Sequence, residues 1–352
     1  MKKFIFCTVA LFLICTLISP VDAPAKGKKF DLSYAGPYFD QHPTVRNAWV
    51  HWFQELKEMS GGGITIKYFN PNTLCPENDH FDSTAQGILD IGGQYNGRNP
   101  GKFPIGEVME LPLIAPSAEA GSLVTWDLYE KYPEWRAEYE GVKMLWQWTS
   151  ATYQLHTTKK LVKSLEDLKG MKIICWSPKL LEMMRSLGAS PIQVAPPDTY
   201  LALQRGMADG VLCPLAPVRS YKITDAVKFH TIVDLCVGPF WTAMNPELWE
   251  SMPGDIQNMF AETTGRKMTI ASGQTLDAGA VEDAQWMKEN GHTFHLLADT
   301  ERERWIEKLN YMRGDWVKNM EARGVADARA ILEDAVALGQ KYAETTGRGY
   351  KE

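Results

Sequence analysis

The sequence has few of the residues and motifs that support covalent or metal chemistry. It contains six cysteines and seven histidines in 352 residues, and none are grouped with the spacing of a zinc site. The G-x-S-x-G elbow, the phosphate-binding loop, the H-E-x-x-H helix and the G-x-G-x-x-G turn do not occur. We therefore expect no catalytic centre, no metal and no cofactor.

Positive charge is not concentrated anywhere beyond the first residues. The chain carries 37 Lys and Arg against 43 Asp and Glu, for a net charge of −6 at pH 7. A chain without a Lys/Arg run lacks the basic surface that binds nucleic acid. A nucleic-acid partner is not expected, and the length and composition suit a globular protein of two domains.

Long apolar runs are missing except at the N-terminus. Two lysines precede an apolar stretch from Phe4 to Ile18, and the small-residue sequence Ala23-Pro-Ala25 follows. The stretch is shorter than the roughly 20 residues that span a bilayer, and the pattern is that of a cleaved signal peptide. We expect a signal peptide at residues 1–25 and a mature protein in the periplasm.

Four cysteines remain after such a cleavage: Cys75, Cys175, Cys213 and Cys236. An oxidising compartment permits disulfides, but no two of these cysteines are close in the sequence. Buried free thiols and a single bridge both stay open.

Strand-like and helix-like patterns alternate along the mature chain. Helical periodicity is found at residues 47–59, 81–88, 118–140, 179–187 and 199–205, and in nearly everything after residue 246. Strand patterns are found at residues 30–35, 64–69, 89–93, 142–148, 153–157, 171–175 and 209–212. This alternation predicts an α/β fold with mostly parallel sheets covered by helices.

Several short motifs follow one another in a recognisable order. They include His42-Pro43, Gly62-Gly-Ile-Thr-Ile, Gln86-Gly-Ile-Leu-Asp-Ile-Gly, Glu110-Leu-Pro-Leu-Ile, Leu165-Glu-Asp-Leu-Lys-Gly, Tyr200-Leu-Ala-Leu-Gln-Arg-Gly and Asn245-Pro-Glu-Leu-Trp. Together they resemble the DctP family, the solute-binding subunits of tripartite ATP-independent periplasmic (TRAP) transporters. The resemblance covers nearly the whole mature chain.

The resemblance implies a two-lobed periplasmic binding fold with a ligand cleft at the hinge and a long helix across both lobes. We expect residues 26–151 and 239–278 in the first lobe, and residues 152–238 and 279–352, with the C-terminal helices, in the second. It also implies a monomeric binding protein that is not an enzyme and that passes a small molecule to TRAP permease subunits. A receptor-linked sensor on the same fold stays open.

The sequence departs from the family at positions expected to hold a carboxylate. Where members carry arginine after the Lys-Ile strand, this chain has Ile174, and Tyr153 stands where a second arginine is expected. Cys213 replaces a family asparagine. Large rings lie in neighbouring segments, at Trp148, Trp176, Phe240 and Trp241. These changes predict an apolar, aromatic cleft.

One arginine remains well placed, because Arg98 follows the strand at residues 89–93 in a loop that reaches the ligand in the family. The predicted site comprises Arg98 and ten other residues: Tyr95, Asn96, Trp148, Tyr153, Ile174, Trp176, Ser177, Cys213, Phe240 and Trp241. Arginine pairs with carboxylates through two parallel hydrogen bonds. We expect a small organic acid with an aromatic (indole-like) or bulky apolar group.

An alternative ligand is a small amine such as ethanolamine or choline. The same rings would hold it by cation–π contacts, and Glu77 or Asp79 would supply the negative charge. The sequence leaves the sign of the ligand's charge open.

Overall fold

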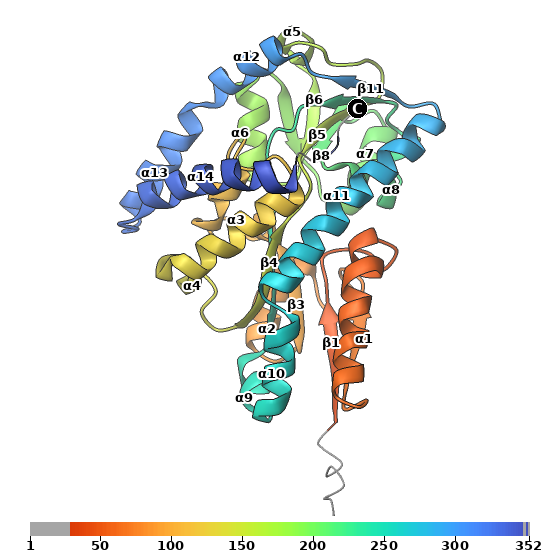
Figure 1. Cartoon of the computed structure of the whole chain (residues 1–352). Coiled ribbons are helices and arrows are strands. Elements are labelled where there is room, and N and C mark those ends of the chain that lie inside the picture. Colours follow the sequence, from red (N-terminus) through yellow and green to blue (C-terminus); the bar gives the residue numbers. More distant parts are fainter. Residues whose placement is uncertain (1–28, 348–349, 351–352) are drawn as a thin grey trace, which may run out of the picture.

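The computed structural model of the protein describes residues 29–347 and Tyr350, so the predicted signal peptide lies outside the described residues. The described strands form two separate sheets, each with helices packed against it (Figure 1). This confirms the predicted α/β class. Within the described ranges no helix has the length and apolar character needed to cross a membrane.

The first sheet has the strand order β2-β1-β3-β10-β4. Its strands are β1 (Phe30–Ala35), β2 (Ile64–Phe69), β3 (Ile91–Tyr95), β4 (Lys143–Thr149) and β10 (Pro239–Met244). β1 runs parallel to β2 and β3, whereas β10 is antiparallel to β3 and β4. The helices on the side of the first sheet are α1 (Val50–Met59), α2 (His80–Ala85), α3 (Ala118–Lys131), α4 (Pro133–Ala137), α9 (Pro246–Glu250) and α10 (Gly254–Thr263).

The second sheet has the order β11-β9-β5-β8-β6-β7. Its strands are β5 (Gln154–Thr157), β6 (Lys172–Cys175), β7 (Ser190–Gln193), β8 (Gly210–Cys213), β9 (Phe229–Ile232) and β11 (Thr293–Leu296). The helices between them are α5 (Leu165–Leu168), α6 (Pro178–Ser186), α7 (Thr199–Gln204) and α8 (Leu215–Ser220).

Two chain segments cross between the sheets, at residues 150–153 and 233–238. They are hydrogen-bonded to each other, from Ser150 N to Gly238 O at 2.8 Å and from Tyr153 N to Cys236 O at 2.9 Å. Such a pair of adjacent crossing segments is the geometry of a hinge. The lobe boundaries that the sequence suggests stay a prediction.

A single long helix, α11 (Arg266–Glu289), runs along both halves (Figure 1). It packs against α3 and β4 on the side of the first sheet and against α8 on the side of the second. Gly273 permits the close approach to α3, since a Cβ there would lie 2.6 Å from the Cα of Glu119. The predicted helix across both lobes is therefore present.

The C-terminal helices are α12 (Asp299–Leu309), α13 (Tyr311–Ala322) and α14 (Ala328–Thr346). α12 packs on α5 and α6, whereas α14 returns to pack on α3 (Figure 1). Gly339 permits the close approach of α14 to the loop before α3, because a Cβ at this position would overlap the carbonyl oxygen of Ile114. The tail thus connects elements of both sheets.

Several sequence-based boundaries differ from the structure, and two of these differences have a clear physical cause. The helix expected at residues 118–140 is broken before Pro133, which begins α4, because proline lacks the amide that would continue the first helix. The strand expected from residue 89 begins at Ile91, and the Asp90 carboxylate instead accepts hydrogen bonds from Ser33.

The four cysteines after the predicted signal peptide form no disulfide with one another. Cys75, Cys175, Cys213 and Cys236 are all free thiols.

Candidate ligand-binding cleft

A small cavity of about 50 Å³ lies between the two sheets beside the crossing segments. Its walls come from the segment after β1, the end of β3, the crossing segment at residues 150–153, β10, the link between β6 and α6, α8 and the middle of α11. The cavity is therefore shared by elements of both sheets. Its lining includes Tyr38, His42, Glu77, Tyr95, Arg98, Ser150, Tyr153, Trp176, Tyr221, Phe240 and Leu276.

Arg98 is placed by local backbone structure. β3 ends at Tyr95, and a 3₁₀ turn, Asn96–Arg98, carries the arginine to the cavity. Its side chain is 13% exposed, and its Nε lies 3.3 Å from Oε2 of Glu77. The two Nη groups of Arg98 make no hydrogen bond within residues 29–347, so they remain available to a ligand.

Aromatic rings form a large part of the cavity wall. Tyr38 stacks on His42 with ring centroids 4.1 Å apart and planes 8° apart. Phe240 contacts Tyr95 at 5.1 Å, and Trp176 meets Tyr221 edge to face at 6.2 Å. Aromatic surfaces of this kind offer a large contact area to a planar apolar group.

Burial keeps the polar groups of the cavity uncharged, apart from the ion pair. It raises the pKa of the Tyr38, Tyr153 and Tyr221 hydroxyls, so these stay protonated and can donate hydrogen bonds. Burial also lowers the pKa of His42 to about 3, and its imidazole is neutral. Arg98 and Glu77 therefore carry the charge of the cavity lining.

A second buried acid lies behind the cavity. Glu110 accepts a hydrogen bond from Ser177, with the Ser177 Oγ 3.1 Å from Oε2. Burial raises the pKa of Glu110 to about 8, so the carboxyl group is largely protonated at neutral pH. It thus adds little negative charge beside the cleft.

Five of the eleven predicted site residues line the cavity: Tyr95, Arg98, Tyr153, Trp176 and Phe240. The other six, Asn96, Trp148, Ile174, Ser177, Cys213 and Trp241, do not line it. The structure thus brings Arg98 together with rings at the end of β3, on the crossing segment at residues 150–153, on β10 and between β6 and α6.

The six remaining residues have structural partners. Trp148 is fully buried and stacks behind Phe240, at 5.3 Å. Trp241 contacts Phe81 and Phe103 in the core of the first sheet, because consecutive strand residues point to opposite faces. Ile174 and Cys213 are fully buried residues of β6 and β8, Asn96 donates to the Tyr139 hydroxyl, and Ser177 caps α6.

Some cavity residues were not predicted, among them Tyr38, His42, Tyr221 and Leu276. Tyr38 follows β1, which is parallel to β3, and the carboxyl ends of parallel strands share one edge of a sheet. This signal could have identified Tyr38 together with Arg98. Tyr221 and Leu276 carry no comparable signal, because they reach the cavity only through helix packing.

Comparison with known proteins gives a consistent result. The family model for bacterial extracellular solute-binding protein, family 7 (DctP), matches residues 38–318. The C4-dicarboxylate-binding periplasmic protein DctP of Rhodobacter capsulatus is 25% identical over 290 residues, which are 80% of this chain and 85% of the relative.

Solved structures show the same architecture. A TRAP solute-binding protein from Rhodoferax ferrireducens, in complex with copurified benzoate, is 26% identical with a TM-score of 0.85, covering 91% of this chain and 100% of the other. A marine metagenome TRAP solute-binding protein specific for aromatic acid ligands, in complex with 3-hydroxybenzoate, is 25% identical with a TM-score of 0.85, covering 90% of this chain and 99% of the other.

The family match spans most of the chain, and the family comprises transport receptors rather than enzymes. Its members bind small molecules in the periplasm and deliver them to the membrane subunits of TRAP transporters. This protein belongs to the DctP family, family 7 of the bacterial extracellular solute-binding proteins, and is a periplasmic TRAP receptor.

Proposed function

We propose that the protein captures a small organic acid with an aromatic or bulky apolar group and passes it to its TRAP permease. The observation that carries this proposal is Arg98 at the wall of an aromatic cavity between the two sheets. A planar guanidinium binds a carboxylate with two parallel hydrogen bonds. The rings of Tyr95, Trp176 and Phe240 would hold the apolar part of the ligand.

Two related proteins support the aromatic part of the proposal. The Rhodoferax ferrireducens protein is described with benzoate, and the marine metagenome protein with 3-hydroxybenzoate. In both cases the identity to this chain is modest, 26% and 25%. They favour aromatic acids as the first ligands to test.

The amine alternative finds no support. Its negative partner was to be Glu77 or Asp79, but Glu77 pairs with Arg98 in the cavity wall, and Asp79 is not among the residues that line it. A cation in this cavity would lie against the Arg98 guanidinium. Like charges at short range inside a protein are unfavourable.

We also propose that the ligand is enclosed by movement of the two lobes about the crossing segments. The cavity is shared by elements of both sheets and is small, about 50 Å³, so a ligand enters only when the lobes separate. Hinge closure around a ligand is a common motion of two-lobed binding proteins.

A thermal-shift panel tests the proposal. Benzoate and indole-3-acetate should raise the melting temperature, because a ligand that binds only the folded state stabilises it. Succinate, which has no ring, and benzylamine, which has a ring of opposite charge, should have little effect. Stabilisation by benzylamine without stabilisation by any aromatic acid would contradict the proposal.

A further inference from the structure

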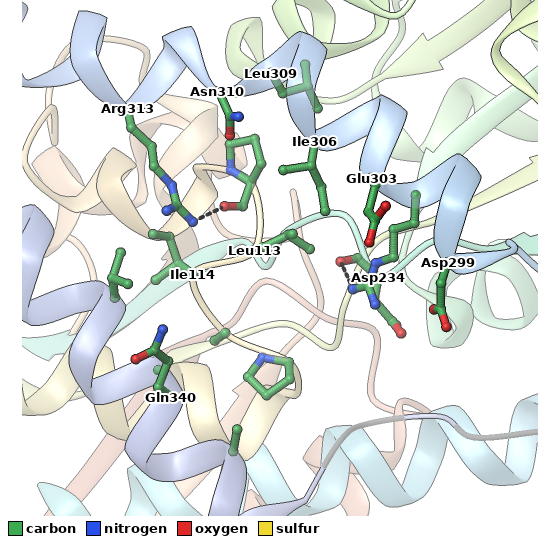
Figure 2. A pocket seen from close by; sticks show the side chains of 17 residues that line it. Leu113, Ile114, Asp234, Asp299, Glu303, Ile306, Leu309, Asn310, Arg313 and Gln340 are labelled. Atoms are coloured by element: carbon green, nitrogen blue, oxygen red, sulfur yellow. Dashed lines mark hydrogen bonds between the residues drawn. The ribbon is translucent and has the colours of Figure 1, made fainter.

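A second and larger cavity, of about 580 Å³, lies among α12, α13, α14 and the loop of residues 112–116. We call it the rear cavity. Figure 2 shows Leu113 and Ile114 in the middle of the view, with Ile306, Leu309 and Arg313 on the helices above them and Gln340 below. Its volume is within the range of about 300–1,000 Å³ that is usual for small-molecule sites.

The rear cavity and the ligand-binding cleft share no lining residue. Asp234, on one crossing segment, faces the rear cavity, and Ser150 and Tyr153, on the other, face the cleft. Figure 1 shows α13 and α14 at the left of the molecule and α8 and α11 at the right. The two cavities thus lie on opposite sides of the hinge.

One end of the rear cavity carries an uncompensated positive charge. Arg313 donates a hydrogen bond from Nη2 to the carbonyl oxygen of Pro112, 2.9 Å away (Figure 2). Within the described ranges the Arg313 guanidinium has no ion-pair partner. Burial lowers its pKa. Asn310 and Gln340, whose side chains lie at the same end, supply further amide groups (Figure 2).

The other end of the rear cavity contains acids together with a second arginine. Asp299 and Glu303 lie there on α12 (Figure 2), and Arg302 donates to the carbonyl oxygen of Asp234 at 3.4 Å. The Asp234 carboxylate is itself occupied, because it accepts hydrogen bonds from Thr152 and Gln154 at 2.7 Å each. An anion would therefore be drawn to the Arg313 end and kept away from the α12 end.

The surface between these ends is apolar. It is formed by the side chains of Leu113, Ile114, Ile306, Leu309 and Val336. A ligand that fits both features has one carboxylate for Arg313 and a short apolar body for this surface. The charge of Arg313 and the apolar surface beside it both favour this class.

We propose that the rear cavity is a second ligand site, which takes a small organic anion with an apolar chain and favours the closed cleft when it is filled. α12 packs on elements of the second sheet, whereas α14 packs on α3 beside the first. Because the crossing segments lie between the two cavities, a rotation of the lobes about these segments that opens the cleft narrows the rear cavity. A molecule in the rear cavity therefore opposes opening of the cleft. The coupling to closure rests on the function proposed above.

Methyl NMR with hexanoate as the probe tests binding. In protein labelled at isoleucine and leucine methyls, hexanoate should shift the resonances of Ile114 and Ile306, and hexylammonium should not. Arg313→Gln should weaken hexanoate binding roughly tenfold, since a hydrogen bond to a charged group is lost. Arg329→Gln changes an exposed arginine of α14 that does not line the cavity, and it should leave the affinity unchanged.

Shifts at Leu276, which lines the cleft, without shifts at Ile114 and Ile306 would overturn the second site. Equal hexanoate affinity in wild type and Arg313→Gln would overturn it as well. Both readouts are independent of whether the cleft binds an aromatic acid.

Calorimetry with benzoate tests the coupling. Saturating hexanoate should raise the affinity for benzoate roughly fivefold or more in the wild type, and this gain should disappear in Arg313→Gln. A benzoate affinity that hexanoate leaves unchanged while Ile114 shifts would overturn the coupling. Absence of benzoate binding under both conditions would contradict the proposed function, and the rear cavity would still be decided by the Ile114 and Ile306 shifts.

Discussion

Single polar atoms decide much of the chemistry of the cleft. The Tyr95 hydroxyl is buried beside the cavity, and within residues 29–347 it has no hydrogen-bond partner. A buried polar group without a partner costs on the order of 1–3 kcal/mol. Such a group is tolerated where a ligand supplies the missing partner.

Replacement Tyr95→Phe should therefore have opposite effects on stability and binding. We expect the ligand-free protein to gain about 1 kcal/mol in the free energy of unfolding, and the affinity for an aromatic acid to fall several-fold. Urea denaturation and calorimetry measure the two effects. Tyr200→Phe, outside the cavity lining, is the control. A less stable variant with unchanged affinity would show that the hydroxyl has no role in binding.

Glu77 competes with the ligand for Arg98, because the Glu77 carboxylate already lies 3.3 Å from the guanidinium. Glu77→Gln removes the competing negative charge and keeps the shape. Affinity for benzoate should rise by on the order of tenfold, or about 1.4 kcal/mol, in a calorimetric titration. Weaker benzoate binding would mean that Glu77 accepts a hydrogen bond from the ligand or is required to position Arg98.

At the scale of elements, four strands of the second sheet are joined by a chain of three buried histidines on β5, on β9 and just before β11. His156 Nε2 lies 3.0 Å from the carbonyl oxygen of Cys213 on β8, and its Nδ1 lies 2.7 Å from Nδ1 of His230. His230 Nε2 is 2.8 Å from Nδ1 of His292, whose Nε2 is 3.0 Å from Nζ of Lys228.

The groups at the two ends of this row of histidines determine which ring nitrogen of each histidine carries the proton. The Cys213 carbonyl can only accept and the Lys228 ammonium can only donate. His156 therefore carries its proton on Nε2, and His230 and His292 carry theirs on Nδ1. All three imidazoles are neutral in this arrangement, and protonation of any one of them removes an acceptor that its neighbour needs.

Acid should consequently weaken the second sheet. Burial lowers the pKa of His156 and of His292 to about 4, and it lowers that of His230 as well; Lys228 acts in the same direction on His230 and His292, whereas Asp225 opposes it at His292. Because the folded-state pKa values lie below the unfolded value of about 6.5, this stability is complete above pH 6.5 and is lost as the pH falls toward 4.

The pKa shift of His156 alone should lower the free energy of unfolding of the protein by about 2 kcal/mol between pH 7 and pH 5. The measurement is the free energy of unfolding across this range. His292→Gln should reduce the slope with pH, and His51→Gln, at an exposed histidine outside the chain, should not. A stability independent of pH between 7 and 5 would contradict the neutral chain of histidines.

Elements with a clear periodicity could be predicted from the sequence. Whether a given side chain lines the cavity or is buried behind another side chain could not. The alternation at residues 30–35 and 64–69 corresponds to β1 and β2 at the same bounds. Phe240 and Trp148 are paired across β10 and β4, yet Phe240 alone lines the cavity and covers Trp148. Sequence patterns identify a face of a strand but give no depth behind that face.

The resemblance to the family predicted the two-lobed architecture and the loop that carries Arg98. It did not predict the Arg98–Glu77 pair, because the two residues belong to separate segments that meet only in the folded chain. The rear cavity could not be predicted either, because it forms where α14 packs on α3, and these helices are separated by more than half of the sequence.

For the whole molecule, the proposed closure has a direct consequence in solution. The described structure has a cleft of only about 50 Å³, so the ligand-free protein must open to admit a ligand. Small-angle scattering should show a smaller radius of gyration with saturating benzoate than without it. An identical scattering profile would contradict closure about the crossing segments.

We propose above all that the ligand is an anion held by Arg98, and one calorimetric titration tests this most directly. Benzoate is titrated into wild type, Arg98→Ala, Arg98→Lys and the control Arg205→Ala, an exposed arginine outside the cavity lining. Because a buried carboxylate would lose its charge partner, Arg98→Ala should lower the affinity roughly a hundredfold, or about 2.8 kcal/mol. Arg98→Lys should recover part of this loss, and Arg205→Ala should bind like the wild type. Benzoate binding that is equally tight or tighter in Arg98→Ala would contradict the claim.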